Sequence, residues 1–205
     1  MHFRRFLYIC YMRQDDRVKS LFDEFVSGSD MRAYDELFHM LCPRLIPFAA
    51  SIVRSFPLAE EIVSDVFLML WQKRAELKEV DQPRVYIYVC VRNFSLNKLP
   101  GNQRTEIPYE HLDGNALSVM PDIEQRLVSE QVTRIVEKAL AGLPPRCRLT
   151  FRLVRIDGLS YKETASVLNV SSKTVDAQLA IAIRRLAEAL RSSMPAHLLG
   201  SFLKV

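Results

Sequence analysis

Near its C-terminal end, the chain carries polar side chains whose types and spacing suit hydrogen bonding to DNA. The segment Gly158–Arg191 predicts two helices joined by a tight turn. Ser160 and Glu163 have the spacing of a capping box, so the first helix should start at Tyr161. Asn169 can adopt the left-handed conformation that ends a helix. A helix-turn-helix of this kind presents its second helix to the major groove.

The second predicted helix begins with an exposed polar stretch. Ser171 can cap it through its hydroxyl, and its apolar residues recur at three- and four-residue spacing, which gives it one buried face. The N-terminal end of such a helix meets base edges. The candidate DNA contacts are Ser171, Ser172, Lys173, Thr174, Asp176, Ala177 and Gln178. The alternative is an ordinary helical hairpin that belongs to a helical core.

The distribution of charge along the chain favours DNA binding over an ordinary helical hairpin. The whole chain of 205 residues has a net charge of only +4. From Ala141 to Arg191, however, nine basic residues stand against four acidic ones. The helix-turn-helix therefore lies in a basic segment, as contact with phosphates requires.

Other classes of function find little support in the sequence. The four cysteines are scattered and form no CxxC pair, which argues against a zinc site and favours reduced thiols in the cytosol. We find no nucleophile elbow, phosphate-binding loop or metal-ligand spacing, so we expect neither an enzyme nor a cofactor. The N-terminal apolar run is too short for a signal peptide, and no segment has the length of a transmembrane helix. We expect a cytoplasmic protein without membrane insertion.

Periodicity predicts an all-α protein made of two small helical domains. The predicted helices cover residues 18–26, 31–40, 44–54, 57–74, 84–98, 127–140, 145–156, 161–168 and 172–191. Between the two groups, Gly101–Gln125 has no periodicity, several prolines and glycines, and five acidic residues against one basic residue. It predicts a flexible acidic linker. The predicted division is an N-terminal tail (1–16), a first domain (17–99), the linker (100–126), a second domain (127–193) and a C-terminal tail (194–205).

Two segments of the first domain have sequence patterns that allow more than one interpretation. In the helix after Pro57, Leu68 lies on the acidic side rather than with the other apolar residues, which indicates either a partner surface or a single exposed leucine. Val85–Val91 is a β-branched and aromatic run that local signals alone would assign to a buried strand. Arginine, lysine, asparagine and tyrosine alternate through Arg84–Lys98. Such a mixture can bind single-stranded DNA or simply occupy a half-buried helix.

Two sequence blocks together resemble the extracytoplasmic-function sigma factors, the smallest bacterial transcription initiation factors. Leu58–Phe67, followed by Leu70 and Trp71, is similar to the conserved region two of that family. Leu143–Phe151, Gly158–Tyr161 and Lys173–Val175 are similar to its region four. The blocks occur in the family's order and at its spacing, with the linker between them.

The resemblance implies a function and a role for each segment. The chain would direct bacterial core RNA polymerase to specific promoters, and an anti-sigma factor would be a further partner. The resemblance also favours a helix for Val85–Val91. The implied polymerase contacts are Glu61, Asp65, Leu68 and Gln72. The implied contacts to the minus-ten element are Arg84, Tyr88, Arg92, Asn93, Asn97 and Lys98, and the candidate residues 171–178 would bind the minus-thirty-five element.

Other functions remain open at this point. A helix-turn-helix regulator could act without polymerase, although the response-regulator type would need an α/β receiver that the N-terminal half does not predict. An adaptor that binds only an anti-sigma factor is the other possibility. The segment after Lys98, which is less basic than in the family, favours the adaptor.

Overall fold

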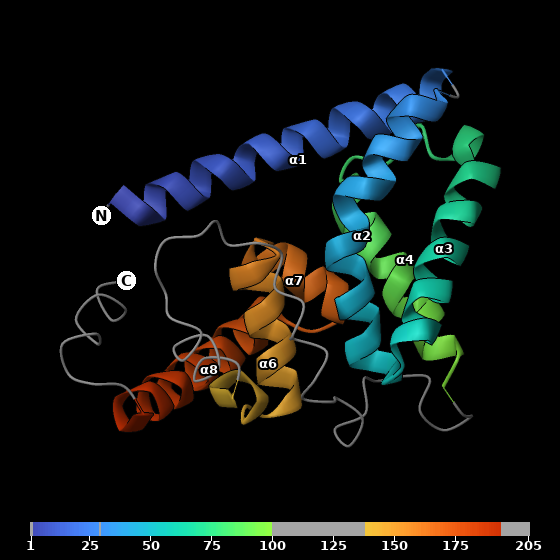
Figure 1. Cartoon of the computed structure of the whole chain (residues 1–205). Coiled ribbons are helices and arrows are strands. Elements are labelled where there is room, and N and C mark those ends of the chain that lie inside the picture. The colour runs from blue at the N-terminus through green and yellow to red at the C-terminus, as the bar shows by residue number, and fades with distance from the viewer. Residues whose placement is uncertain (1, 29, 100–137, 194–205) are drawn as a thin grey trace.

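The computed structural model describes residues 2–28, 30–99 and 138–193, and these residues form helices without any strand. Figure 1 shows their arrangement. The elements are α1 (His2–Gly28), α2 (Met31–Val53), α3 (Phe56–Gln72), the short 3₁₀ helix η1 (Arg74–Glu76), α4 (Pro83–Asn97), α6 (Pro145–Phe151), the π-helix η5 (Arg152–Ile156), α7 (Tyr161–Leu168) and α8 (Ser172–Ser193). The predicted all-α class is confirmed. The predicted linker, and most of the predicted helix 127–140, lie outside the described residues.

The elements α1 to α4, with η1, form an N-terminal bundle. Helix α2 packs against α1, α3 and α4 (Figure 1). Aromatic rings join three of these helices, since Trp71 of α3 stacks on Phe25 of α1 at 5.8 Å and meets Tyr34 of α2 edge-on at 5.2 Å between ring centroids. Such pairs add to the stabilisation that burial of the rings provides. Helix α1 also begins much nearer the N-terminus than the predicted helix 18–26.

Helix α2 is continuous, which corrects the prediction of two helices meeting near Pro43. Pro43 and Pro47 both lie inside it. Each proline removes one backbone hydrogen bond. The helix persists because Leu41, Leu45 and Phe48 continue one buried face through both prolines. Tertiary packing therefore outweighs the local helix-breaking signal.

Helix α2 also corrects the expectation about membrane spans. Its 23 residues are long and apolar enough to cross a membrane by length and composition. In the fold, however, these apolar residues form the contacts to α1, α3 and α4. They constitute the core of a bundle, which gives the same composition as a membrane helix.

Val85–Val91 lies within helix α4, as the family resemblance implied and the local strand signal did not. Val85, Ile87 and Val91 are buried, because α4 packs against α2 and α3 on one side and against α7 on another. A helix surrounded in this way is apolar over most of its surface. Its sequence is therefore hard to distinguish from that of a buried strand.

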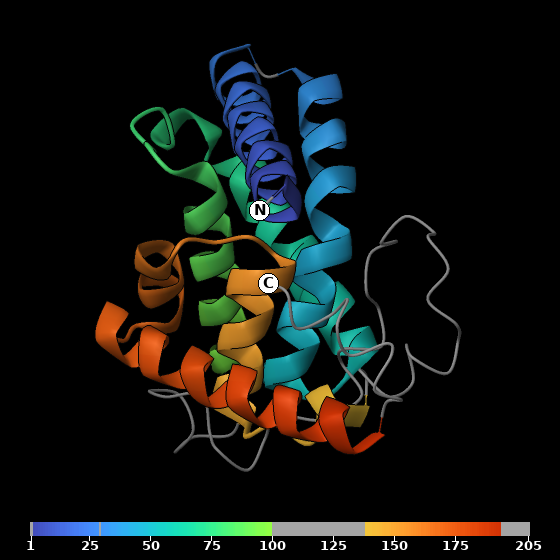
Figure 2. The same ribbon diagram turned by 90° about the vertical axis from the view of Figure 1, so that its left-hand side faces the viewer.

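The elements α6, η5, α7 and α8 form a C-terminal bundle. Helix α8 packs against α6 and α7, and Figure 2 shows it crossing the lower end of the molecule in front of α6. Leu143, Cys147, Ala182 and Leu186 share a small apolar cluster between α6 and α8. The N-terminal half of α8 is thereby held against the bundle by one face only.

The predicted helix 145–156 changes its hydrogen bonding partway along. It is α-helical to Phe151 and π-helical from Arg152. The connection that follows turns at Gly158, whose φ of 74° suits a residue without a Cβ. This turn leaves Asp157 completely buried.

Candidate functional site

The two helices of the helix-turn-helix form as predicted. Ser160 and Glu163 make both hydrogen bonds of the capping box, with the Ser160 N–H donating to Glu163 Oε2 at 2.6 Å and the Glu163 N–H donating to Ser160 Oγ at 3.2 Å. Asn169 ends α7 in the left-handed conformation, with φ 55° and ψ 49°. The start and the end of α7 are therefore fixed by residues within a few positions of one another.

The structure divides the candidate contacts of α8 into exposed and engaged side chains. Ser171 Oγ accepts a hydrogen bond from the Thr174 N–H at 3.0 Å, so its hydroxyl caps the helix. Gln178 Oε1 accepts a hydrogen bond at 2.6 Å from the hydroxyl of Thr150, which is buried in α6. Thr174 is half-buried. The side chains open to solvent at this end of the helix are Ser171, Ser172, Lys173, Asp176 and Ala177.

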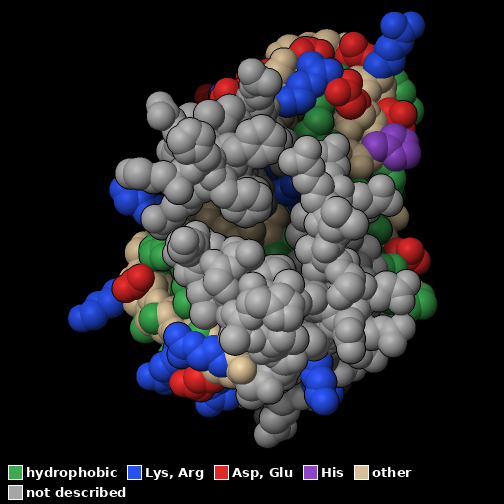
Figure 3. All heavy atoms as spheres, turned by 60° about the vertical axis from the view of Figure 1, so that its left-hand side comes forward, with side chains coloured by type: hydrophobic (Ala, Val, Ile, Leu, Met, Phe, Trp, Pro, Cys, Tyr) green, Lys and Arg blue, Asp and Glu red, His purple; other side chains and the backbone are tan. Residues whose placement is uncertain are grey.

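The C-terminal bundle also carries exposed cationic side chains further along α8. Arg184, Arg185 and Arg191 are exposed. In Figure 3, Lys and Arg side chains gather near the lower end of the visible face, at the height that α8 occupies in Figure 1. Exposed arginines of this kind can contact DNA phosphates.

The candidate polymerase contacts lie together on one face of α3. Glu61 and Gln72 are exposed, Asp65 is half-buried, and Leu68 is 53% exposed. Lys98, from the end of α4, lies against this face. Its Nζ is 2.7 Å from Glu61 Oε1 and 4.0 Å from Asp65 Oδ2, and the hydrogen bond that Lys98 donates to Glu61 raises the pKa of Lys98. An apolar side chain thus stands among charges on a face that no other described helix covers.

Helix α4 places its six candidate residues in two different environments. Asn93, Asn97 and Lys98 are exposed. Arg84, Tyr88 and Arg92 are only 6%, 0% and 9% exposed, and burial lowers the pKa of Arg92. The structure therefore leaves three of the six predicted minus-ten contacts open to solvent and buries the other three.

Two of the enclosed residues, Arg84 and Tyr88, belong to a buried polar cluster that the sequence did not reveal. We call it the interdomain cluster, since it joins Arg44 and Tyr88 of the N-terminal bundle to Arg152 and Asp157 of the C-terminal bundle. Arg44 Nη1 donates to the Asp157 carbonyl at 3.1 Å, Arg152 Nη2 donates to the Arg44 carbonyl at 3.5 Å, and Arg152 Nε lies 3.5 Å from Asp157 Oδ2. Asp157 and Gly158 indicate only the end of a helix in the sequence. Nothing in the sequence pairs them with Arg44.

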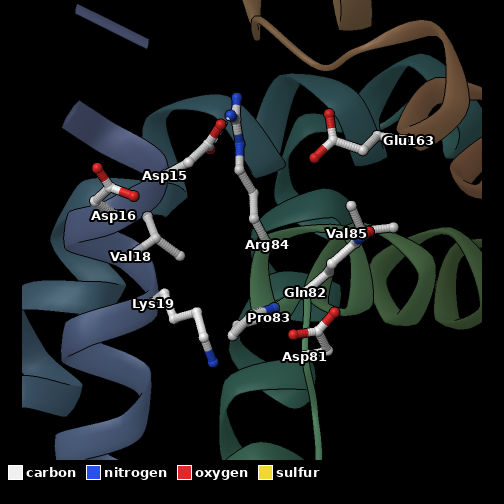
Figure 4. A pocket seen from close by; sticks show the side chains of 10 residues that line it. All are labelled: Asp15, Asp16, Val18, Lys19, Asp81, Gln82, Pro83, Arg84, Val85 and Glu163. Carbon is white, nitrogen blue, oxygen red and sulfur yellow. Dashed lines mark hydrogen bonds and ion pairs between the residues drawn. The ribbon is translucent and has the colours of Figure 1, made fainter. Parts of the chain in front are cut away.

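Electrostatics at the interdomain cluster combine desolvation with an excess of positive charge. Burial raises the pKa of the Asp157 carboxyl, and the nearby Arg152, Arg44 and Arg84 oppose that effect. Burial also raises the pKa of the Tyr88 hydroxyl, as does the charge of Asp157. Arg84 forms an ion pair with Asp15 of α1. Figure 4 shows Arg84 extending from α4 between Asp15 and Glu163, in a small open pocket where α1, α4 and α7 meet.

The described residues contain no candidate metal site and no thiol activated by its surroundings. No group of three or more His, Cys, Asp or Glu residues there could hold a metal ion. Cys42, Cys90 and Cys147 are free thiols, buried or half-buried, and burial raises the pKa of each. A raised pKa keeps a thiol protonated and unreactive at neutral pH.

Comparison with known protein families finds two matches, in the order that the sequence blocks predicted. Residues 37–105 match sigma-70 region 2, and residues 133–186 match sigma-70 region 4. The first match includes α3 and α4, and the second includes α6 to α8 apart from the end of α8.

Similar proteins of known kind align along most of the chain. The "ECF RNA polymerase sigma-E factor" of Escherichia coli (strain K12) is 25% identical over 167 residues, which cover 76% of this chain and 85% of the relative. The same factor of Salmonella typhimurium (strain LT2) gives the same identity and coverage. The "RNA polymerase sigma-H factor" of Pseudomonas aeruginosa is 21% identical over 176 residues, with 82% of this chain and 91% of the relative covered.

A solved structure has a similar fold. It is described as the structure of CnrH in complex with the cytosolic domain of CnrY, and it aligns with a TM-score of 0.56 and 22% sequence identity over 88% of this chain and 99% of that one. At this identity the likeness supports the fold alone. Because regions 2 and 4 occur in order and its relatives are factors of the same kind, the chain belongs to the extracytoplasmic-function group of the sigma-70 family.

Proposed function

We propose that this protein directs bacterial core RNA polymerase to specific promoters and thereby initiates transcription. Its own role is non-catalytic and cytoplasmic: it binds polymerase and DNA, and the polymerase performs the chemistry. The observation that carries the proposal is the presence of sigma-70 region 2 and of region 4, with its helix-turn-helix, in one chain. A free-standing DNA-binding regulator would have no need of region 2.

Helix α3 provides the polymerase contact in this proposal. Leu68 is 53% exposed, and Glu61, Asp65 and Gln72 surround it on the same face. An exposed apolar side chain within a charged rim has the composition of a protein-binding surface, where the apolar anchor supplies affinity and the charges supply orientation.

The promoter contacts divide between the two bundles. The open N-terminal end of α8, with Lys173, Asp176 and Ala177, binds the minus-thirty-five element in the major groove. There Lys173 contacts phosphate, and Asp176 can accept a hydrogen bond from a cytosine amino group. Asn93 and Asn97 of α4 contact the minus-ten element, together with Arg84, Tyr88 and Arg92 once these become accessible. Capture of an unpaired base there costs a few kcal/mol of unstacking.

An anti-sigma factor is a further proposed partner. The similar solved structure is a complex of CnrH with the cytosolic domain of CnrY. A partner of that kind would cover the same faces of α3 and α4 that polymerase and DNA require.

Run-off transcription with bacterial core polymerase tests the function directly. The template is a pool of candidate promoters that includes the region upstream of this protein's own gene. Transcripts with fixed starts should appear only when the protein is present. Leu68→Arg and Asp65→Arg should abolish them, because a buried or repelled charge at the polymerase contact weakens binding.

Met31→Arg is the matched control for Leu68→Arg. Met31 is also exposed, at 62%, but belongs to α2 rather than to α3. Transcription should survive this change. A protein that binds core polymerase without any transcript would favour the adaptor, and one that neither binds core nor yields transcripts would overturn the proposal.

A further inference from the structure

Gln178 differs from the open candidate DNA contacts of α8 because its side chain is engaged inside the C-terminal bundle. Its Oε1 accepts a hydrogen bond from Thr150 Oγ1 at 2.6 Å. Thr150 belongs to α6 and is 0% exposed, whereas Gln178 is half-buried. One polar contact therefore joins the proposed recognition helix to α6, across 28 positions of the chain.

The position of Gln178 around α8 suits a lateral anchor. Successive residues of an α-helix differ in direction by about 100°. The buried face of α8 consists of three apolar residues, Val175, Leu179 and Ala182. The exposed face carries the open candidate contacts Lys173, Asp176 and Ala177. Gln178 lies on the flank between these two faces, so a bond to its side chain resists rotation of the helix about its axis.

The hydrogen bond adds a directional constraint that the apolar face of α8 does not supply. Hydrophobic contact has no preferred direction. A hydroxyl hydrogen bond, in contrast, requires a donor–acceptor distance of about 2.7 Å and a favourable angle. Thr150 is β-branched and lies in a helix, so its hydroxyl has few available positions. The bond therefore defines the rotation of α8 relative to α6 more narrowly than apolar packing does.

A small rotation of α8 has a large effect on contacts with bases. An α-helix with its side chains is about 10–12 Å across, so a rotation of about 20° moves the side-chain tips by about 2 Å. A displacement of that size breaks a hydrogen bond to a base edge. Lys173 and Asp176 would then lose their alignment with DNA even though α8 remained helical.

The same hydrogen bond limits what Gln178 itself can contact. Glutamine recognises adenine with its amide oxygen and amide nitrogen together. The amide oxygen of Gln178 is directed to Thr150 instead, so a contact of that kind would require the hydrogen bond to break. The arrangement favours a role in positioning the helix over a direct contact with a base.

We propose that Gln178 is a positioning residue, whose hydrogen bond to Thr150 fixes the rotation of α8 and thereby directs Lys173, Asp176 and Ala177 at the minus-thirty-five element. The proposal rests on the proposed function, because it takes α8 to be the helix that contacts this element. It has a specific consequence. Thr150, which is fully buried and cannot touch DNA, controls how well the protein discriminates between promoter sequences.

Four single variants isolate the hydrogen bond. Thr150→Val keeps the shape of the side chain and removes the hydroxyl, and Gln178→Leu removes the amide. Gln178→Glu keeps an oxygen that can accept the hydrogen bond from Thr150. Thr164→Val is the matched control, since Thr164 is also 0% exposed in the C-terminal bundle and its Oγ1 has no hydrogen-bond partner among the described residues.

Run-off transcription with core polymerase measures the discrimination. The reference template is the promoter that gives the strongest transcript with the wild-type protein. Each companion template carries one substituted base pair in the minus-thirty-five element of that promoter. Discrimination is the amount of transcript from the reference divided by the amount from the companion, and for a contacted base pair the wild-type ratio should be about fivefold or more.

Thr150→Val and Gln178→Leu should each lower the discrimination by about two- to tenfold, which is the contribution of one hydrogen bond. Because both changes remove the same bond, the double variant should lose no more than either single variant. Gln178→Glu and Thr164→Val should keep the wild-type ratio, although the added charge of the glutamate lowers transcription from every template. Helix content by circular dichroism and binding to core polymerase should be unchanged in every variant.

The possible results separate the positioning role from the proposed function. Wild-type discrimination in Thr150→Val would overturn the positioning role, and a loss in Gln178→Leu alone would mean that Gln178 contacts DNA directly. An equal loss in Thr164→Val would also overturn it, since any buried hydroxyl would then have the effect. If Thr150→Val does not fold, the comparison of Gln178→Leu with Gln178→Glu tests the same bond. Absence of transcripts with the wild-type protein on every template would instead overturn the proposed function, and the positioning role with it.

Discussion

The basic side chains along α4 differ in their exposure to solvent because each has different neighbours. Arg84 and Arg92 are buried, whereas Lys98 of the same segment reaches solvent and pairs with Glu61. All three are candidate phosphate contacts by residue type. Only burial distinguishes the side chain that is open to solvent from the two that are enclosed.

Burial also raises the pKa of several thiol and phenol side chains in the N-terminal bundle, Cys42 and Tyr86 among them, which predicts a loss of stability at alkaline pH. Burial raises the pKa of Cys42 from 9.0 to about 12, and that of Tyr86 from 10.0 to about 12. A pKa that is raised in the folded state favours folding only while the group stays protonated. The free energy of unfolding should be constant near neutral pH and should decrease as the pH rises from about 9 to about 12.

Urea unfolding at a series of pH values checks this prediction. A Cys42→Ala variant should show a smaller alkaline decrease than the wild type, since it lacks one of these groups. Iodoacetamide should leave Cys42 of the native protein unmodified at pH values below 9 and should modify it in urea. If the free energy of unfolding decreased equally in both proteins at alkaline pH, the raised pKa of Cys42 would be contradicted.

Among the elements, α7 depends most on its cap. It spans only eight residues, which is too short to form alone in water. Its start is fixed by the two hydrogen bonds between Ser160 and Glu163. Since α7 positions α8, the same cap orients the proposed recognition helix.

Ser160→Ala should therefore destabilise the C-terminal bundle by about 1 kcal/mol, the usual effect of losing an N-cap. Ser166→Ala is the control, because Ser166 is exposed within the same helix and alanine has the higher helix propensity. Thermal unfolding should give a lower midpoint for Ser160→Ala, and an unchanged or higher midpoint for Ser166→Ala. Equal midpoints would show that the capping box contributes nothing.

At the scale of the whole molecule, the shared hydrophobic cluster couples the two bundles. Leu153 and Val167 of the C-terminal bundle pack in the same cluster as Phe48 and Ile87 of the N-terminal bundle. Unfolding of one bundle would expose apolar surface on the other. The bundles should therefore unfold together as long as they remain in contact.

Scanning calorimetry should show a single transition for the wild-type protein and for the control Arg32→Glu, which makes the same change of charge at an exposed position of α2, the helix that also carries Arg44. Arg44→Glu removes the hydrogen bond to the Asp157 carbonyl and places a second carboxylate near Asp157, which should weaken the contact, so it should show two transitions, one for each bundle. Two transitions in the wild-type protein would mean that the contact is too weak to couple unfolding. A single transition in Arg44→Glu would mean that Arg44 does not control the contact.

The sequence by itself determined the helix-turn-helix and the identity of the two regions. The capping box at Ser160, the left-handed Asn169 and the start of α8 depend on residues within a few positions of one another, so local chemistry is sufficient to predict them. The same holds for the exposed position of Leu68, which follows from helical periodicity.

The tertiary structure alone decided the course of α2 through Pro43 and Pro47, and the burial of the α4 face. Both depend on contacts between residues far apart in the chain. Arg44 and Asp157, for example, are separated by 113 positions and are joined by one hydrogen bond. Local patterns show that α4 has arginines and aromatic residues, but they contain no information on which other helix covers them. The packing of α4 against the C-terminal bundle is therefore set by contacts and electrostatics between the bundles, because these energies exist only after the chain has folded.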